Sequence, residues 1–133
     1  MSSLLRTILS AAVVAAASLS PVAAFADTSL GIYQTTDRKM DYDLRLCGNG
    51  EKQLCVMLKD ARGTALTEQT RKFVGKDIVH NATPAGKNVW KGSVSIAGRT
   101  LDGTLTLNAG TNFVMHGCLY VVVCNDFTLI PAK

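Results

Sequence analysis

Apolar and polar residues alternate along most of the chain after residue 26, and a period of two predicts β-strands. The clearest strand is the segment 40–47, with one apolar side and one polar side, as expected of a sheet that covers a core. Gly48-Asn49-Gly50 then predicts a reversal, because glycine and asparagine tolerate positive φ. The apolar members of this strand and of its return strand are Met40, Tyr42, Leu44, Leu46, Leu54, Val56 and Leu58.

The same pattern, broken by turn signals, predicts about eight short strands. Antiparallel sheets of this size commonly remove their edges by closing, so we expect an all-β, up-and-down barrel, with a β-sandwich as the alternative. Turns are predicted at residues 83–86, 97–98 and 109–112, and residues 61–76 form the least regular stretch. Gly103 predicts a bulge or sharp bend. The predicted strands are residues 30–35, 40–47, 54–58, 77–81, 88–96, 99–108, 113–118 and 124–130.

The inward row of apolar residues is the first candidate binding site. The interior of an eight-stranded barrel is just wide enough to be filled by side chains or to hold one small ligand, and the sequence leaves both readings open. The candidate lining consists of Met40, Tyr42, Leu44, Leu46, Leu54, Val56, Leu58, Trp90, Leu105 and Leu107.

The N-terminus has the features of an export signal. Arg6 supplies positive charge, residues 8–19 form an uninterrupted core of apolar and small residues, and Ala24-Phe25-Ala26 fits the pattern that signal peptidase cleaves. We therefore expect a signal peptide over residues 1–26 and a single mature domain over residues 27–133, located in the periplasm or secreted. No later apolar stretch is long enough to cross a bilayer, and we expect a monomer.

Four cysteines, Cys47, Cys55, Cys118 and Cys124, lie in the predicted mature domain. An even number behind an export signal predicts two disulfides in an oxidising compartment. In one continuous strand Cys118 and Cys124 would lie about 20 Å apart, too far to bond, so the chain reverses between them or each has another partner. We favour Cys47–Cys55, on the outer side of the first hairpin, and Cys118–Cys124; the other pairings stay open.

If Cys118 and Cys124 pair, an apolar segment forms the tip of a disulfide-bonded hairpin. Exposing it to water is costly, so we expect the tip to fold over one barrel end, or to contact a partner or a membrane surface. The tip residues are Leu119, Tyr120, Val121, Val122 and Val123.

Other candidate chemistry is weak. The net charge of +4 is spread along the chain, which does not indicate a nucleic-acid site. His116 and Cys118 share a strand face, but an exported cysteine with a nearby mate is usually a disulfide. His80, His116 and two thiolates lack the short ligand spacing of a zinc site, and Asp41 and Asp43 fit surface charges. We therefore expect no enzyme, no cofactor and no metal.

Five short motifs resemble an exported bacterial family, the domain of unknown function numbered 2147. They are Gly31-Ile32-Tyr33, Leu54-Cys55, Trp90-Lys91-Gly92, Gly98-Arg99-Thr100-Leu101 and Gly117-Cys118-Leu119.

The resemblance implies a lipocalin-like barrel of eight strands with an internal cavity, in a periplasmic or secreted protein with no established reaction. The sequence departs from the family at Tyr33, where the family usually has tryptophan, and at Val56, where it usually has glycine. It also lacks an arginine in the last strand.

Two functions follow from the sequence. The first is binding of a small apolar molecule inside the barrel. The second is a structural or interaction module of the cell envelope whose barrel is filled and which contacts another envelope protein.

Overall fold

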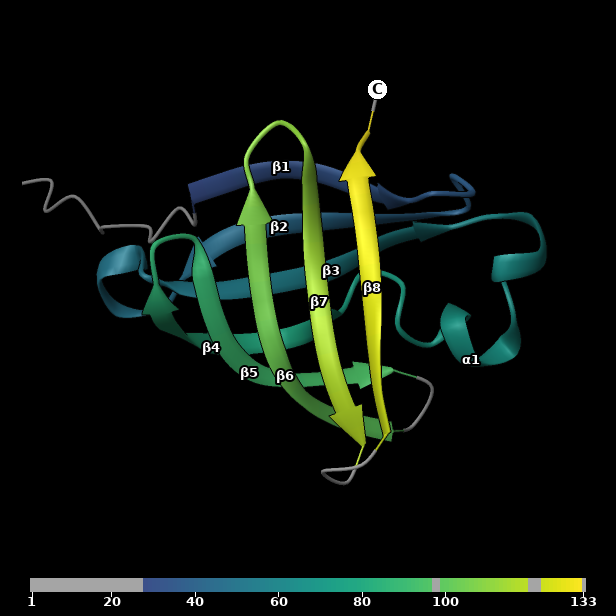
Figure 1. Ribbon diagram of the computed structural model, residues 1–133. Helices are drawn as coiled ribbons and strands as arrows, with labels where there is room; N and C mark the ends of the chain where they lie inside the picture. The colour runs from purple at the N-terminus through teal and green to yellow at the C-terminus, as the bar shows by residue number, and fades with distance from the viewer. Residues whose placement is uncertain (1–27, 97–98, 120–122, 133) are drawn as a thin grey trace, which may run out of the picture.

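The computed structural model is a closed antiparallel barrel of eight strands in chain order, which confirms the predicted fold class and excludes the sandwich (Figure 1). It describes residues 28–96, 99–119 and 123–132. The predicted signal peptide therefore lies outside the described residues. The elements are β1 (Thr28–Thr35), β2 (Met40–Cys47), η1 (Asn49–Glu51), β3 (Gln53–Ala61), η2 (Gly63–Ala65), α1 (Glu68–Arg71), β4 (Asp77–Gly86), β5 (Val89–Ile96), β6 (Arg99–Asn108), β7 (Asn112–Leu119) and β8 (Val123–Pro131).

The barrel closes where the first and last strands meet. The register between β1 and β8 runs from Tyr33↔Pro131 to Thr35↔Leu129, and the Ala132 amide donates a hydrogen bond to the Ile32 carbonyl at 2.9 Å. Figure 1 shows β6, β7 and β8 crossing in front of β1, β2 and β3 at a steep angle. The first part of β8, from Val123 to Thr128, lies outside this short seam with β1.

A single cluster of apolar side chains fills the interior between these strands. Phe113, Leu44, Leu54 and Leu105 are among its largest fully buried members. The rings of Tyr33 and Phe113 pack in a tilted arrangement with their centroids 6.4 Å apart. Every residue of the predicted interior row is a member of this cluster or packs against it.

Two local predictions were wrong. The turn expected at residues 83–86 lies later, at Lys87 and Asn88, and Pro84 belongs to β4. Proline fits there because the register of β3 with β4 ends at Leu54↔Ala82, so Pro84 lies beyond β3 and needs no ladder partner on that side.

The second concerns the predicted bulge at Gly103. The registers of β6 with both neighbours run through Gly103 without a shift. The glycine is instead a point of close backbone approach, since an added Cβ would overlap the His116 carbonyl oxygen.

The irregular stretch between β3 and β4 carries η2 and the one-turn helix α1. Thr67 caps α1, accepting a hydrogen bond from the Thr70 amide at 3.2 Å. After the helix, Phe73 and Val74 pack against the core cluster, so this connection covers part of one barrel end.

Candidate functional site

Three glycines lie side by side across neighbouring strands at one end of the barrel. Gly92 of β5 pairs with Gly103 of β6, which pairs with Gly117 of β7. Because side chains alternate along a strand, these glycines occupy inward positions, in step with the buried Trp90 and Met115. At Gly92 and Gly103 an added Cβ would crowd Ala82 and the His116 carbonyl oxygen, so only Gly117 of this row borders a recess.

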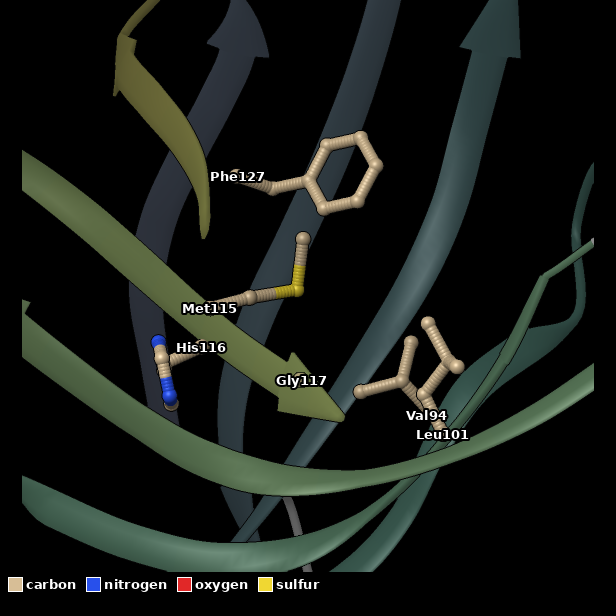
Figure 2. A pocket seen from close by; sticks show the side chains of 6 residues that line it. All are labelled: Val94, Leu101, Met115, His116, Gly117 and Phe127. Atoms are coloured by element: carbon tan, nitrogen blue, oxygen red, sulfur yellow. The ribbon is translucent and has the colours of Figure 1, made fainter. Parts of the chain in front are cut away.

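The space next to this row is a small apolar recess, which we call the cup (Figure 2). Figure 2 shows the side chains of Met115 and Phe127 on one side and those of Val94 and Leu101 on the other. The cup encloses ≈ 250 Å³ of empty space including its solvent-filled mouth, but only ≈ 10 Å³ is open to the centre of a water molecule. That is about one water, far below the 300–1,000 Å³ of a typical ligand pocket.

Phe127 marks the open side of the cup. Phe127 pairs across the strands with Met115, whose side chain faces inward and is 4% exposed, so the side chain of Phe127 faces inward too. Phe127 is nevertheless 45% exposed. Val123, also in inward register, is 57% exposed. The first half of β8 therefore presents apolar side chains to solvent, and one of them, Phe127, lines the cup.

The predicted lining residues lie elsewhere. All belong to the packed core or border it, and the residues that line the cup are different ones: Val94, Leu101, Met115, His116, Gly117 and Phe127. Sequence reasoning missed the cup because its lining comes from four strands, β5 to β8, and their cross-strand register was not visible in the sequence.

The predicted apolar tip is only partly described. Pairing continues one step past the second disulfide to Leu119↔Val123, so these two residues belong to β7 and β8. Tyr120, Val121 and Val122 lie outside the described residues.

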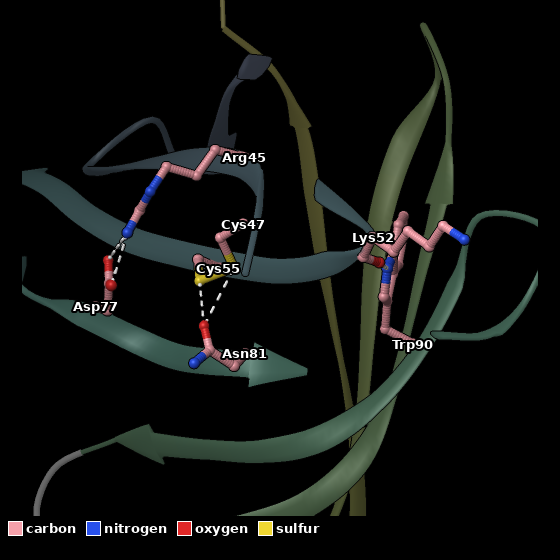
Figure 3. Close-up of a disulfide and its surroundings, with 7 residues drawn as sticks. All are labelled: Arg45, Cys47, Lys52, Cys55, Asp77, Asn81 and Trp90. Carbon is pink, nitrogen blue, oxygen red and sulfur yellow. Dashed lines mark hydrogen bonds and ion pairs between the residues drawn. A yellow bond between two sulfur atoms is a disulfide. The ribbon is translucent and has the colours of Figure 1, made fainter. Parts of the chain in front are cut away.

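The four cysteines form the two sequence-local disulfides, Cys47–Cys55 and Cys118–Cys124. Cys47 and Cys55 lie on the strand face opposite the core leucines but are only 3% exposed each. Figure 3 shows Asn81 of β4 over this bond, with Oδ1 at 3.4 Å from Cys47 Sγ and 3.2 Å from Cys55 Sγ. A disulfide sulfur has no proton to donate, so these are packing contacts.

Asn81 reaches the disulfide because β4 is irregular at this point. The register with β3 shifts between Leu54↔Ala82 and Val56↔Val79, which places two β4 residues, His80 and Asn81, opposite one β3 residue. Asn81 has φ 50, in the left-handed region that asparagine tolerates. A bulge of this kind re-aims a side chain.

Two further contacts fix this part of the barrel (Figure 3). Arg45 Nη2 donates to both carboxylate oxygens of Asp77 at 2.7 and 2.6 Å, joining β2 to the start of β4. The indole Nε1 of Trp90 donates to the Lys52 carbonyl at 3.0 Å. The hydrogen bond satisfies the polar atom of an otherwise buried ring.

The predicted surface carboxylate Asp41 has a defined partner. Arg62 donates to both oxygens of Asp41, at 2.8 and 3.0 Å, and to Asp60 at 2.8 Å. The hydrogen bonds that Arg62 donates to Asp41 hold the pKa of Asp41 below its usual range. The bonds that Arg62 donates to Asp41 and, with a smaller effect, to Asp60 raise the pKa of Arg62. The arrangement is an ion-pair cluster that ties β2 to the end of β3.

The predicted Cys-His neighbours also meet in space. His116 Nε2 lies 3.9 Å from Cys118 Sγ, and His116 Nδ1 contacts Asp126 Oδ1. Because Cys118 is bonded to Cys124 and none of the four cysteines is free, the group has no thiol nucleophile in this form.

Comparisons of the chain with protein-family models, with curated proteins and with solved structures found no match. The described part of the chain contains no helix long and apolar enough to span a membrane.

Proposed function

We propose that the chain is an exported binding protein of the periplasm or the extracellular space, and that it holds one end of a small apolar molecule at the mouth of the cup. The role is non-enzymatic. Two disulfides suit an oxidising compartment, and the export signal and the family resemblance predicted from the sequence point to the same location.

The observation that carries the proposal is the half-open state of the cup. Phe127 is in inward register beside a buried Met115 but remains 45% exposed, so apolar surface lies uncovered next to an apolar recess. Burying such surface contributes about 25 cal/mol per Å². A ligand that covers Phe127 gains this contribution.

The size of the cup restricts the ligand. Its inner space admits about one water, and the buried residues beyond it form one apolar cluster. We therefore propose that an apolar end of the ligand covers the mouth of the cup beside Phe127 and Leu101, while the remainder lies along the exposed part of β8.

The packed interior favours a second candidate function, an envelope interaction module with a filled barrel. Phe113, Leu44, Leu54 and Leu105 are fully buried in one apolar cluster between the strands. In this case Val123 and Phe127 contact another protein, and no small molecule is bound.

Filling the cup tests the first function. Leu101→Trp places an indole in the recess, whereas Leu66→Trp adds the same group on the β3–β4 connection, where Leu66 is 40% exposed and does not line the cup. We expect an apolar fluorescent probe, anilinonaphthalene sulfonate, to bind wild type and Leu66→Trp equally and Leu101→Trp at least tenfold more weakly.

Equal probe binding by both variants would overturn the proposal. Native mass spectrometry of gently purified protein separates the two functions, since a small molecule that co-purifies supports the first. A bare chain that also fails to bind the probe supports the second.

A further inference from the structure

Four side chains form a square on the outer face of the β7–β8 hairpin. His116 pairs across the strands with Asp126, and Cys118 pairs with Cys124 two residues further along. His116 and Cys118 alternate along β7 with the inward-facing Met115, and Asp126 and Cys124 lie opposite them in β8, so all four side chains project outward. The side chains of His116 and Asp126 are 53% and 64% exposed, which leaves the group open to solvent.

The square contains three metal-ligand atoms in one small volume. A ring nitrogen of His116 and the sulfurs of Cys118 and Cys124 all lie within 4.8 Å of one another. His116 Nδ1 faces the Asp126 carboxylate, so the hydrogen bond to Asp126 leaves Nε2 as the nitrogen with a free lone pair. That nitrogen is the one beside Cys118 Sγ, at 3.9 Å.

We propose that reduction of the Cys118–Cys124 bond creates a binding site for a borderline-soft divalent cation such as Zn²⁺. The ligands are the thiolates of Cys118 and Cys124 and Nε2 of His116, with water in the fourth position. Asp126 orients the imidazole through Nδ1, the usual arrangement around a metal-bound histidine. The oxidised protein has no thiolates and does not bind.

The chemistry balances with an external dithiol as the reductant. The dithiol transfers two electrons to the Cys118–Cys124 bond, which breaks to two thiols, while the dithiol becomes its own disulfide. Binding of Zn²⁺ then displaces the two thiol protons to water. In the reverse exchange the disulfide form of the same dithiol takes two electrons back from Cys118 and Cys124, which reforms their bond, regenerates the dithiol and releases the cation.

The distances suit a tetrahedral ion. Zn–S bonds of about 2.3 Å and Zn–N bonds of about 2.0 Å place sulfur and nitrogen ligands about 3.5 Å apart. The present Nε2 to Sγ distance of 3.9 Å is close to this value. The two sulfurs must separate once their bond is broken, and the exposed Cys124 has room to rotate away from the half-buried Cys118.

The other disulfide provides an internal contrast. Cys47 and Cys55 are each 3% exposed and lie against Asn81 rather than a histidine. The metal-ligand group identified in the described part of the chain contains neither of them. Sequence spacing argued against a metal because it considers ligands within one segment, whereas these ligands come from two paired strands.

Cobalt binding tests the proposal on the full mature chain. Mild anaerobic reduction with a phosphine, which unlike a dithiol does not compete strongly for metal, is followed by titration with Co²⁺ and then Zn²⁺. We expect one Co²⁺ per chain with a thiolate-to-cobalt absorption band that Zn²⁺ removes, and no band for the oxidised protein.

Variants assign the ligands. We expect Cys118→Ser/Cys124→Ser to abolish the band, His116→Ala to weaken binding at least 100-fold, and Asp126→Asn to weaken it about 10–100-fold. His80→Ala is the matched control, because His80 is also exposed on a strand but lies outside the group. Circular dichroism checks that each variant keeps its β-sheet signal.

Two results would overturn the proposal. The first is a band that survives in the Cys118→Ser/Cys124→Ser variant, which would assign the metal to Cys47 and Cys55. The second is reduced wild type that binds no more Co²⁺ than the oxidised form, with alkylation and mass measurement showing Cys118 and Cys124 reduced.

Discussion

Tyr42 illustrates how single residues in this barrel depend on their surroundings. Its ring is buried in the core, and the hydroxyl has only the weak acceptor Met40 Sδ at 3.8 Å. Burial, with a smaller contribution from the negative charge of Asp37, raises the pKa of Tyr42 to about 12. The neutral phenol is therefore favoured in the folded protein.

We predict that Tyr42→Phe makes the protein more resistant to alkali. A raised pKa gives stability that is complete below the unfolded value of 10.0 and is lost as pH rises through about 12. The loss amounts to about 2–3 kcal/mol in wild type and is absent in Tyr42→Phe. At neutral pH the variant should differ by about 1 kcal/mol or less, because the lost contact is weak.

Urea unfolding followed by circular dichroism between pH 8 and 12 measures this difference. Parallel loss of stability by wild type and variant above pH 10 would contradict it.

The strands show how glycine shapes a whole element. Gly103 lets β6 and β7 approach closely, because an added Cβ would overlap the His116 carbonyl oxygen, and Gly117 lines the cup. The sequence predicted β2 and β6 with the bounds that the structure has, since turn signals flank both. It did not predict the role of Gly103, because that role depends on the backbone of the strand alongside.

Gly103→Ala should prevent stable folding, or cost more than about 4 kcal/mol, because the new Cβ would overlap the His116 carbonyl oxygen and the backbone cannot move aside. Gly86→Ala is the matched control in another strand, where the added Cβ would make an ordinary contact with Val89 Cβ at 3.8 Å. We expect the control to stay within about 1 kcal/mol of wild type. Thermal unfolding of the two variants measures both effects, and similar melting temperatures would show that the glycine row is dispensable.

At the scale of the whole molecule, stability depends on a short closing seam. Leu129 of β8 pairs with Thr35 of β1 and Phe113 of β7, and it is 1% exposed. Phe127 lies two residues earlier on the same face but beyond the reach of β1. Neighbouring parts of β8 thus form the seam, where Leu129 is buried, and the mouth of the cup, where Phe127 is half exposed.

Leu129→Ala should therefore destabilise the barrel by about 2–5 kcal/mol, as expected for a buried leucine. Phe127→Ala removes a larger side chain but should cost only about 1 kcal/mol, because the ring is already half exposed. Urea midpoints of the two variants give the comparison. A larger loss for Phe127→Ala would mean that the mouth, rather than the seam, holds the barrel together.

The barrel as a whole was predictable because alternation, turn residues and strand number all favour the same closed sheet. The cup was not, because its lining requires knowing which residues of different strands face each other. The His116–Cys118–Cys124 group was predictable in part: the sequence placed His116 and Cys118 on one strand face and favoured the Cys118–Cys124 bond, but it did not give the position of His116 Nε2 beside the sulfurs. Alternation shows which side of a strand is apolar, but Gly117 could be aligned with Gly103 only once the hairpins were paired.

The pairing of Tyr33 with Pro131 joins two residues that lie close to opposite ends of the described chain. Contacts between residues so distant in sequence are the slowest to form, because they close the largest loop. A nascent chain cannot complete its barrel until the final strand has left the ribosome. Until then, β1 and whichever strand was made last are both unpaired edges, open to association with other unfinished chains.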